Sequence, residues 1–234
     1  EAIDIMGSRY HEEALKRAEE CDNTEDKAFY LRMAKAFLTV PKKPAYDFMS
    51  AMCSFMLVFA LDGSDSPGRF DQYMYPYYAA DIQSGKLTEE SALKLTEEFF
   101  LSFNRDSDLY IGMQQGDNGQ SMMLGGVTRD GKCAVNALTE ICLKASLHNR
   151  RIDPKINMRV NKDTPLSLYE KCTELTRQGL GFPQYSNDDV VIQGSVGSTV
   201  IALKTDRQGH VKNNGHRQHV VSLGQCHQFF FLAV

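Results

Sequence analysis

The pattern of apolar and polar residues predicts a series of helices in the first part of the chain. Residues 9–38 carry apolar side chains at helical spacing on two faces, with a polar break at residues 21–24. This break predicts two helices, with Thr24 as the N-cap of the second. Residues 45–61 are apolar almost all round, which predicts a third helix that is buried on most sides.

Short strand-like segments alternate with helices in the second part of the chain. Thr88 precedes two glutamates and a run of apolar residues at helical spacing, which predicts a helix that starts there. Strands are predicted at residues 122–127 and 155–160. The helix after the second strand is predicted to open at Thr164-Pro165, with proline as its first residue. Long helices separated by short strands predict an α/β fold with parallel strands.

The composition excludes several classes of protein. Of the 234 residues 42% are hydrophobic, which is typical of a folded domain, and the net charge of −4 offers no basic surface to nucleic acid or to an anionic membrane. No apolar run approaches the roughly 20 residues that span a bilayer, and no signal peptide is visible. The six cysteines are scattered without a CxxC pair, which indicates reduced thiols and a cytoplasmic protein.

The composition changes near Gln193. Residues 194–234 hold one acidic residue and four of the six histidines, whereas residues 1–193 hold the other 29 of the 30 acidic residues. We therefore expect a domain at residues 1–193 and a divergent tail at residues 194–234, of natural or frameshifted origin. His216 and His219 have a spacing that suits zinc on a helix, but no paired CxxC accompanies them, so no metal site is predicted.

Four ordered segments carry a family resemblance. Their sequences are VPKKPAYDFMSAM (40–52), GRFDQYMYPYYAADIQSGKLTEESALKLTEEFF (68–100), LGGVTRDGKCAVNALTEICLKA (124–145) and PKINMRVNKDTPLSLYEKCTELTRQGLGFPQYSNDDVVI (154–192). The set resembles the glycyl radical enzymes, the pyruvate formate-lyase superfamily, and the second segment is similar to a signature of its dehydratase and lyase members. Four segments that occur in the family's order indicate this resemblance far more specifically than a single motif would.

The resemblance implies a fold and a chemistry. It implies a ten-stranded α/β barrel of two half-barrels, of which this chain would form roughly one half-barrel with its surrounding helices. In the family a backbone glycine stores a radical, which a separate radical SAM activating enzyme with a [4Fe-4S] cluster installs. A cysteine inside the barrel then abstracts hydrogen from a small polar substrate, in a lyase or dehydratase reaction of anaerobic metabolism. No bound cofactor is expected on this chain, and a homodimer is left open for the intact enzyme.

Neither radical-bearing residue of the family is found. The family's thiyl cysteine lies shortly beyond the N-D-[DE] element in a C-x-E context, but no C-x-E follows Asn187-Asp188-Asp189. Cys226 is followed by His227 and matches nothing in the family. The R-V-[SA]-G-Y-type motif of the radical glycine is also absent. We therefore expect a central piece of the enzyme that has no catalytic residue of its own and is inactive alone.

The resemblance also implies substrate-binding residues in two loops. Ser64 matches the second residue of a His-Ser pair that contacts substrate hydroxyls in relatives that dehydrate glycerol, and Gly63 stands in place of the histidine. Gly119 stands where many relatives place a bulky aromatic residue. A larger and more polar pocket is therefore expected, lined by Asp117, Asn118 and Gln120. The alternatives are a loop-capping role for Ser64 and an ordinary polar turn around Gly119.

Three further residues are expected near the substrate, each with a structural alternative. Phe70 is expected either to face the pocket or to pack. Asn187 and Asp188 follow a strand-like run and are expected near the site, or else to hold loops by local hydrogen bonds. Arg69 and Asp71 are expected to pin their loop by charge-assisted hydrogen bonds, and the tyrosines beside them to pack at the seam between a helix and the barrel wall.

The sequence leaves two other functions open. A non-catalytic ligand-binding module built on half a barrel would use the polar loop at residues 114–121 and would respond to a specific ligand. A fragment of an acyl-transferring pyruvate formate-lyase would carry paired cysteines and a bulky aromatic residue at the position of Gly119. An open half-barrel also exposes strand edges and core surface, which predicts poor solubility.

Overall fold

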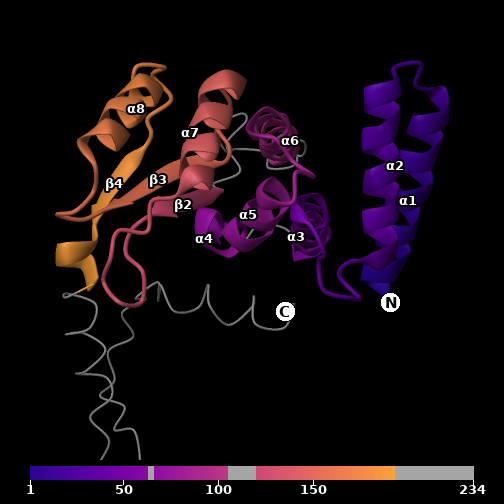
Figure 1. Cartoon of the computed structure of the whole chain (residues 1–234), viewed down its shortest axis with the longest axis horizontal. Coiled ribbons are helices and arrows are strands. Elements are labelled where there is room, and N and C mark those ends of the chain that lie inside the picture. The colour runs from indigo at the N-terminus through magenta and orange to yellow at the C-terminus, as the bar shows by residue number, and fades with distance from the viewer. Residues whose placement is uncertain (63–65, 105–119, 193–234) are drawn as a thin grey trace, which may run out of the picture.

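Two long helices form one end of the molecule in this computed structural model, which describes residues 1–62, 66–104 and 120–192. α1 (Ala2–Glu20) and α2 (Thr24–Thr39) lie side by side at the end opposite the sheet (Figure 1). The side chain of Asn23 caps α2 by accepting hydrogen bonds from the amides of Glu25 and Asp26. The predicted N-cap Thr24 is therefore wrong by one residue, because Asn23 has the extended backbone of a cap and Thr24 is already helical.

Four helices lie between this hairpin and the sheet (Figure 1): α3 (Phe48–Asp62), α4 (Phe70–Tyr73), α5 (Tyr75–Gln83) and α6 (Glu89–Ser102). The predicted burial of α3 is confirmed over its first half, where Phe48, Met49 and Met52 are at most 3% exposed. Thr88 forms a capping box with Ser91, which explains why α6 begins after this threonine. Among the described residues, none of the helices is long and apolar enough to cross a membrane.

Four parallel strands form one sheet in the order β1-β2-β3-β4, which confirms the predicted parallel α/β fold. The strands are β1 (Gly68–Arg69), β2 (Ser121–Gly125), β3 (Lys155–Val160) and β4 (Gln184–Asn187). α7 (Ala137–Asn149) connects β2 to β3, and α8 (Leu166–Thr176) connects β3 to β4. Pro165 is the N-cap of α8 and not its first helical residue, since its ψ of 139° is extended.

The core lies between one face of the sheet and the helices. Met122, Leu124, Ile156 and Met158 are fully buried and belong to one apolar cluster that also contains side chains of α3, α6, α7 and α8. Alternate strand residues point to opposite faces, so this cluster defines the helix side of the sheet. Tyr185 of β4 lies on the same side, because its ring is 5.9 Å from that of Tyr169 in α8.

An aromatic cluster attaches α4 to α3 and α6. Phe70 is fully buried and stacks on Phe99 with ring centroids 5.2 Å apart, and Tyr73 stacks on Phe55 at 6.5 Å. The Tyr73 hydroxyl donates a hydrogen bond to the carbonyl of Pro67 at 2.8 Å. Tyr73 thus packs its ring and pairs its hydroxyl, as expected of a tyrosine at a seam between elements.

Candidate functional site

The sheet face opposite the helices carries polar side chains. In β3, Asn157 and Arg159 alternate with the buried apolar residues and are only partly buried. The register places Gln184 beside Asn157 and Ser186 beside Arg159 on β4, so these four side chains share one face. We call this surface, which β1 and β2 extend through Arg69 and Met123, the open face.

The carboxyl end of β1 brings Arg69 to this face. Its Nη2 atom donates to the carbonyl oxygens of Gly125 at 2.9 Å and Val127 at 3.0 Å. Burial lowers the pKa of the Arg69 guanidinium, and the nearby positive charge of Arg159 lowers it further, whereas Asp71 raises it. Arg69 therefore makes charge-assisted hydrogen bonds as expected, and its partner is the chain that leaves β2, which the sequence did not specify.

Asp71 connects the end of β2 to the start of α7. Its carboxylate is fully buried and accepts hydrogen bonds from the amide of Gly125 at 2.7 Å, from the Thr139 hydroxyl at 2.5 Å and from the Gln72 side chain at 3.0 Å. Burial is the main reason that the pKa of Asp71 lies above its usual value, although the three donors act in the opposite direction. The predicted pinning role of Asp71 is confirmed.

Two consecutive glycines let the strand ends approach one another. Gly125 and Gly126 have φ angles of +71° and +88°, where side chains are strained. A Cβ atom on Gly126 would lie 2.9 Å from Asp188 Oδ2 and 3.1 Å from Arg159 Nε. The amide of Gly126 also donates to the carbonyl of Arg159 at 2.8 Å. Only glycine fits between this arginine and this aspartate.

Asp188 and Arg159 form a buried ion pair at the carboxyl ends of β3 and β4. Arg159 Nε donates to Asp188 Oδ1 at 2.8 Å, and the two side chains are 14% and 2% exposed. Within the described part of the chain, two buried atoms beside this pair have no hydrogen-bond partner: Asp188 Oδ2 and Arg69 Nε. Buried polar groups nearly always have partners, so this edge of the sheet is suited to receive a further polar group.

The predicted site residues do not all gather at this edge. Ser64, Asp117, Asn118 and Gly119 lie outside the described residues. Gln120 is buried directly before β2, where its amide donates to Asp153 Oδ1 and its carbonyl accepts from the amide of Lys155. All strands are parallel, so Gln120 lies at the edge where they begin and Asp188 lies at the edge where they end.

The remaining predicted residues have different surroundings. Phe70 packs in the aromatic cluster, which fits the packing alternative. Asn187 is exposed and its side chain accepts a hydrogen bond from the amide of Asp189, a local contact of the kind that the sequence left open. Asp188 is the one predicted residue that the described structure places at the carboxyl edge with a buried, unpartnered oxygen. The substrate-binding roles of these residues stay predictions.

Sequence reasoning missed the residues that build the open face. The sequence analysis assigned no individual role to Arg159, Asn157, Ser186 or Gly126, which occur only within the longer segments that it considered. Two signals point to them. One is the alternation of polar and apolar residues in KINMRV, and the other is a pair of glycines directly after a strand, which indicates a close approach of another chain segment.

The described residues offer no group of His, Cys, Asp and Glu that could hold a metal ion. The most buried of the described cysteines lie on helices: Cys53 in α3, Cys142 in α7 and Cys172 in α8. Burial raises the pKa of Cys53 to about 12 and that of Cys172 to about 11, and it also raises the pKa of Cys142. These thiols are protonated members of the core and belong to the helix side of the sheet.

Comparisons with known proteins agree with this architecture. A family profile described as "Pyruvate formate lyase-like" matches residues 1–209. A (2S)-3-sulfopropanediol dehydratase of Klebsiella oxytoca is 37% identical over 137 residues, which are 56% of this chain and 17% of that protein. An isethionate sulfite-lyase of Bilophila wadsworthia is 32% identical over 205 residues, which are 82% of this chain and 25% of that protein.

A solved structure confirms the expected fold. The crystal structure of a glycyl radical enzyme from Archaeoglobus fulgidus matches with a TM-score of 0.75 and 25% identity, over 84% of this chain and 27% of that one. The chain therefore has the fold of part of a glycyl radical enzyme barrel. It spans about a quarter or less of the length of these relatives. The expected division at residue 193 stays a prediction.

Proposed function

The chain belongs to the pyruvate formate lyase-like family, and on this premise we propose that its sheet forms part of the wall of a substrate cavity in a glycyl radical lyase or dehydratase. The observation that carries the proposal is the open face. Apart from Met123 its side chains are polar and none is fully buried, whereas on the opposite face the β2 and β3 side chains are buried beneath the helices.

The physical argument concerns how parallel sheets are covered. Parallel sheets in α/β proteins have both faces covered, and strands covered by helices on both sides are apolar throughout. β3 alternates instead, with Asn157 and Arg159 between buried apolar residues. A polar inner face is the expected lining of a barrel that encloses a polar ligand. The polar side chains of the open face are therefore suited to binding a small polar substrate.

The chain's own residues would orient the substrate and exclude water. Asn157 and Ser186 offer neutral hydrogen-bonding groups, and Arg159 offers a guanidinium whose charge is paired with that of Asp188. Hydrogen abstraction is not assigned to Cys53, Cys142 or Cys172, because these thiols are buried among the helices. The dry interior that radical chemistry needs would come from closing the barrel over this face.

The proposal extends to the partners of the intact enzyme. It includes a glycyl radical, a radical SAM activating enzyme with a [4Fe-4S] cluster that installs it, and a cytoplasmic location. Similarity to lyases and dehydratases supports the glycyl radical, since one structural relative is itself described as a glycyl radical enzyme. The expected inactivity of this chain alone stays a prediction.

Isethionate is the probe that tests this function. It carries a hydroxyl and a sulfonate, which suit the amide of Asn157 and the positive charge of Arg159 on the open face. We expect isethionate to bind the full chain in isothermal titration calorimetry, and ethylene glycol, which lacks the sulfonate, to bind more weakly. Asn157→Leu should weaken isethionate binding about tenfold, because one hydrogen bond to a charged ligand is lost.

The control is Arg9→Gln, which removes an exposed arginine of α1 at the end of the molecule opposite the sheet. This variant should bind isethionate as the unaltered chain does. A loss in Arg9→Gln that equals the loss in Asn157→Leu would show that isethionate binding does not depend on the open face, and would contradict the proposal. Circular dichroism of both variants verifies that the fold is retained.

A further inference from the structure

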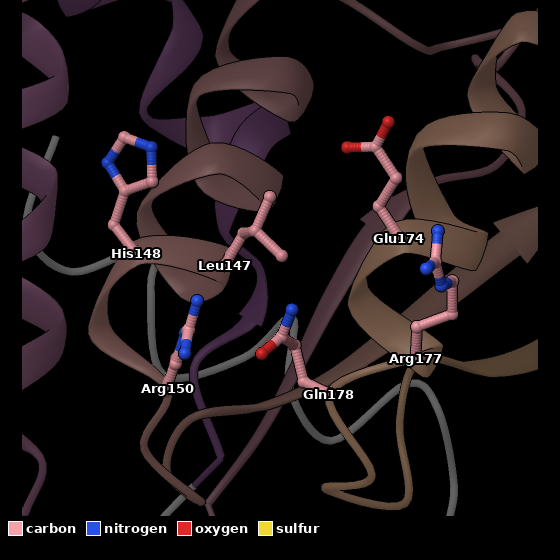
Figure 2. Close-up of a pocket in the computed structure, with 6 residues that line it drawn as sticks. All are labelled: Leu147, His148, Arg150, Glu174, Arg177 and Gln178. Atoms are coloured by element: carbon pink, nitrogen blue, oxygen red, sulfur yellow. The ribbon is translucent and has the colours of Figure 1, made fainter.

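A second polar cavity lies at the edge of the sheet where the strands begin. Its volume is about 660 Å³, and its lining residues are Leu147, His148, Arg150, Glu174, Arg177 and Gln178. These residues come from the last turns of α7 and α8 and the positions that follow (Figure 2). Both helices return to the beginning of the next strand, so this cavity is on the side away from Asp188.

Two arginines in this cavity have no partner among the described residues. No hydrogen bond or ion pair within the described ranges involves the guanidinium of Arg150 or Arg177, or the side-chain amide of Gln178. Figure 2 shows Arg150 on the α7 side and Arg177 on the α8 side, with Gln178 between them. His148 is already paired, since its Nδ1 lies 2.6 Å from Glu97 Oε1. The donors that remain available are thus two guanidinium groups and one amide.

The local conformation holds both arginines at this place. Arg150 ends α7 in the left-handed region with φ of 51°, and its amide donates to the carbonyl of Ser146. Arg177 is the C-cap of α8, and its amide donates to the carbonyl of Thr173. A left-handed non-glycine residue carries strain that glycine would avoid, so Arg150 adopts this backbone conformation at some energetic cost.

We propose that this cavity binds the phosphate group of a small ligand, or inorganic phosphate. Planar guanidinium groups donate paired hydrogen bonds to oxyanions, and the lining carries two of them against one carboxylate, that of Glu174. The cavity volume lies within the range of small-molecule sites, and its polar lining favours a charged ligand over an apolar one. This site is separate from the open face and does not rest on the proposed function.

Glu174 supplies the sharpest test, because it is the one carboxylate that lines the cavity. It repels a bound anion, so Glu174→Gln should bind inorganic phosphate several-fold more tightly than the unaltered chain at low ionic strength. A gain in affinity cannot arise from misfolding. It is also not expected if the two arginines serve only to neutralise the carbonyl ends of their helices.

Phosphate titration by calorimetry of the full chain and its variants completes the experiment. Arg150→Gln and Arg177→Gln should each weaken binding about tenfold. Arg151→Gln, which removes a neighbouring exposed arginine that does not line the cavity, should leave the affinity unchanged. Glycerol phosphate in a parallel titration distinguishes a phosphate monoester from free phosphate as the preferred ligand.

Three results would contradict the proposed phosphate site. They are an absence of phosphate binding, an equal loss in Arg151→Gln, and an unchanged or weaker affinity in Glu174→Gln. The second result would assign any binding to the overall positive charge of this surface. Arg177→Lys adds a check on geometry, since lysine keeps the charge but lacks the two-pronged donor, and its affinity should fall between those of arginine and glutamine.

Discussion

Replacing Asp71 with alanine is expected to lower the free energy of unfolding by about 3 kcal/mol, because three donors, two of them buried, lose this acceptor at once. These donors are the buried amide of Gly125, the buried hydroxyl of Thr139 and the half-buried side chain of Gln72, which keeps a second acceptor in the carbonyl of Ala134. They belong to β2, α7 and α4, so the loss separates the elements that meet at the carboxyl edge. Urea unfolding followed by circular dichroism measures the difference.

Two further variants define the origin of this effect. Asp71→Asn keeps the shape but turns one oxygen into a donor that faces another donor, so it should cost about 1 kcal/mol. Asp130→Ala removes an exposed carboxylate that pairs with Lys132 and Thr128 and should change stability by less than about 0.5 kcal/mol. Equal losses in Asp71→Ala and Asp130→Ala would show that Asp71 does not hold these elements together.

Replacing Gly126 with alanine is expected to destabilise the chain by about 2–4 kcal/mol. Part of this loss is the strain of a left-handed alanine, about 1–2 kcal/mol. The remainder arises because the new Cβ would approach Asp188 Oδ2 at 2.9 Å and Arg159 Nε at 3.1 Å, which forces the ion pair apart. Thermal unfolding in a calorimeter measures the total.

Gly131→Ala is the matched control for this prediction. Gly131 has a φ of +79°, close to that of Gly126, but a Cβ there would meet no atom within 4 Å. Its loss should therefore be limited to the backbone strain. The difference in stability loss between the two variants measures the cost of the contacts that the new Cβ makes with Asp188 and Arg159. A difference near zero would mean that these two side chains move aside without an energetic cost, which would contradict the prediction.

Much of the fold could be predicted from the sequence because local signals were strong. The alternation in KINMRV predicted β3 with its observed bounds, and the acidic residues after Thr88 predicted the start of α6. The predicted starts of α2 at Thr24 and of α8 at Pro165 were each wrong by one residue. Whether a residue is the cap or the first helical residue depends on its ψ angle, which composition does not specify.

The site could be predicted only in part, because its geometry depends on register between strands. The resemblance singled out Asp188, but nothing local in the sequence places Asp188 against Gly126, which precedes it by 62 positions. Gln120 was grouped with Asp188 although the parallel sheet separates them to opposite edges. Residues that line one face of a sheet become neighbours only through pairing, which single-sequence reasoning does not resolve.

A crystal structure of the full chain grown with isethionate tests the central claim most directly. If the open face is the wall of a substrate cavity, the ligand should lie against β3 and β4, with a polar atom within hydrogen-bonding distance of Asn157 or Arg159. Isethionate bound only at exposed side chains on the helix side of the sheet, with the open face bare, would contradict the account.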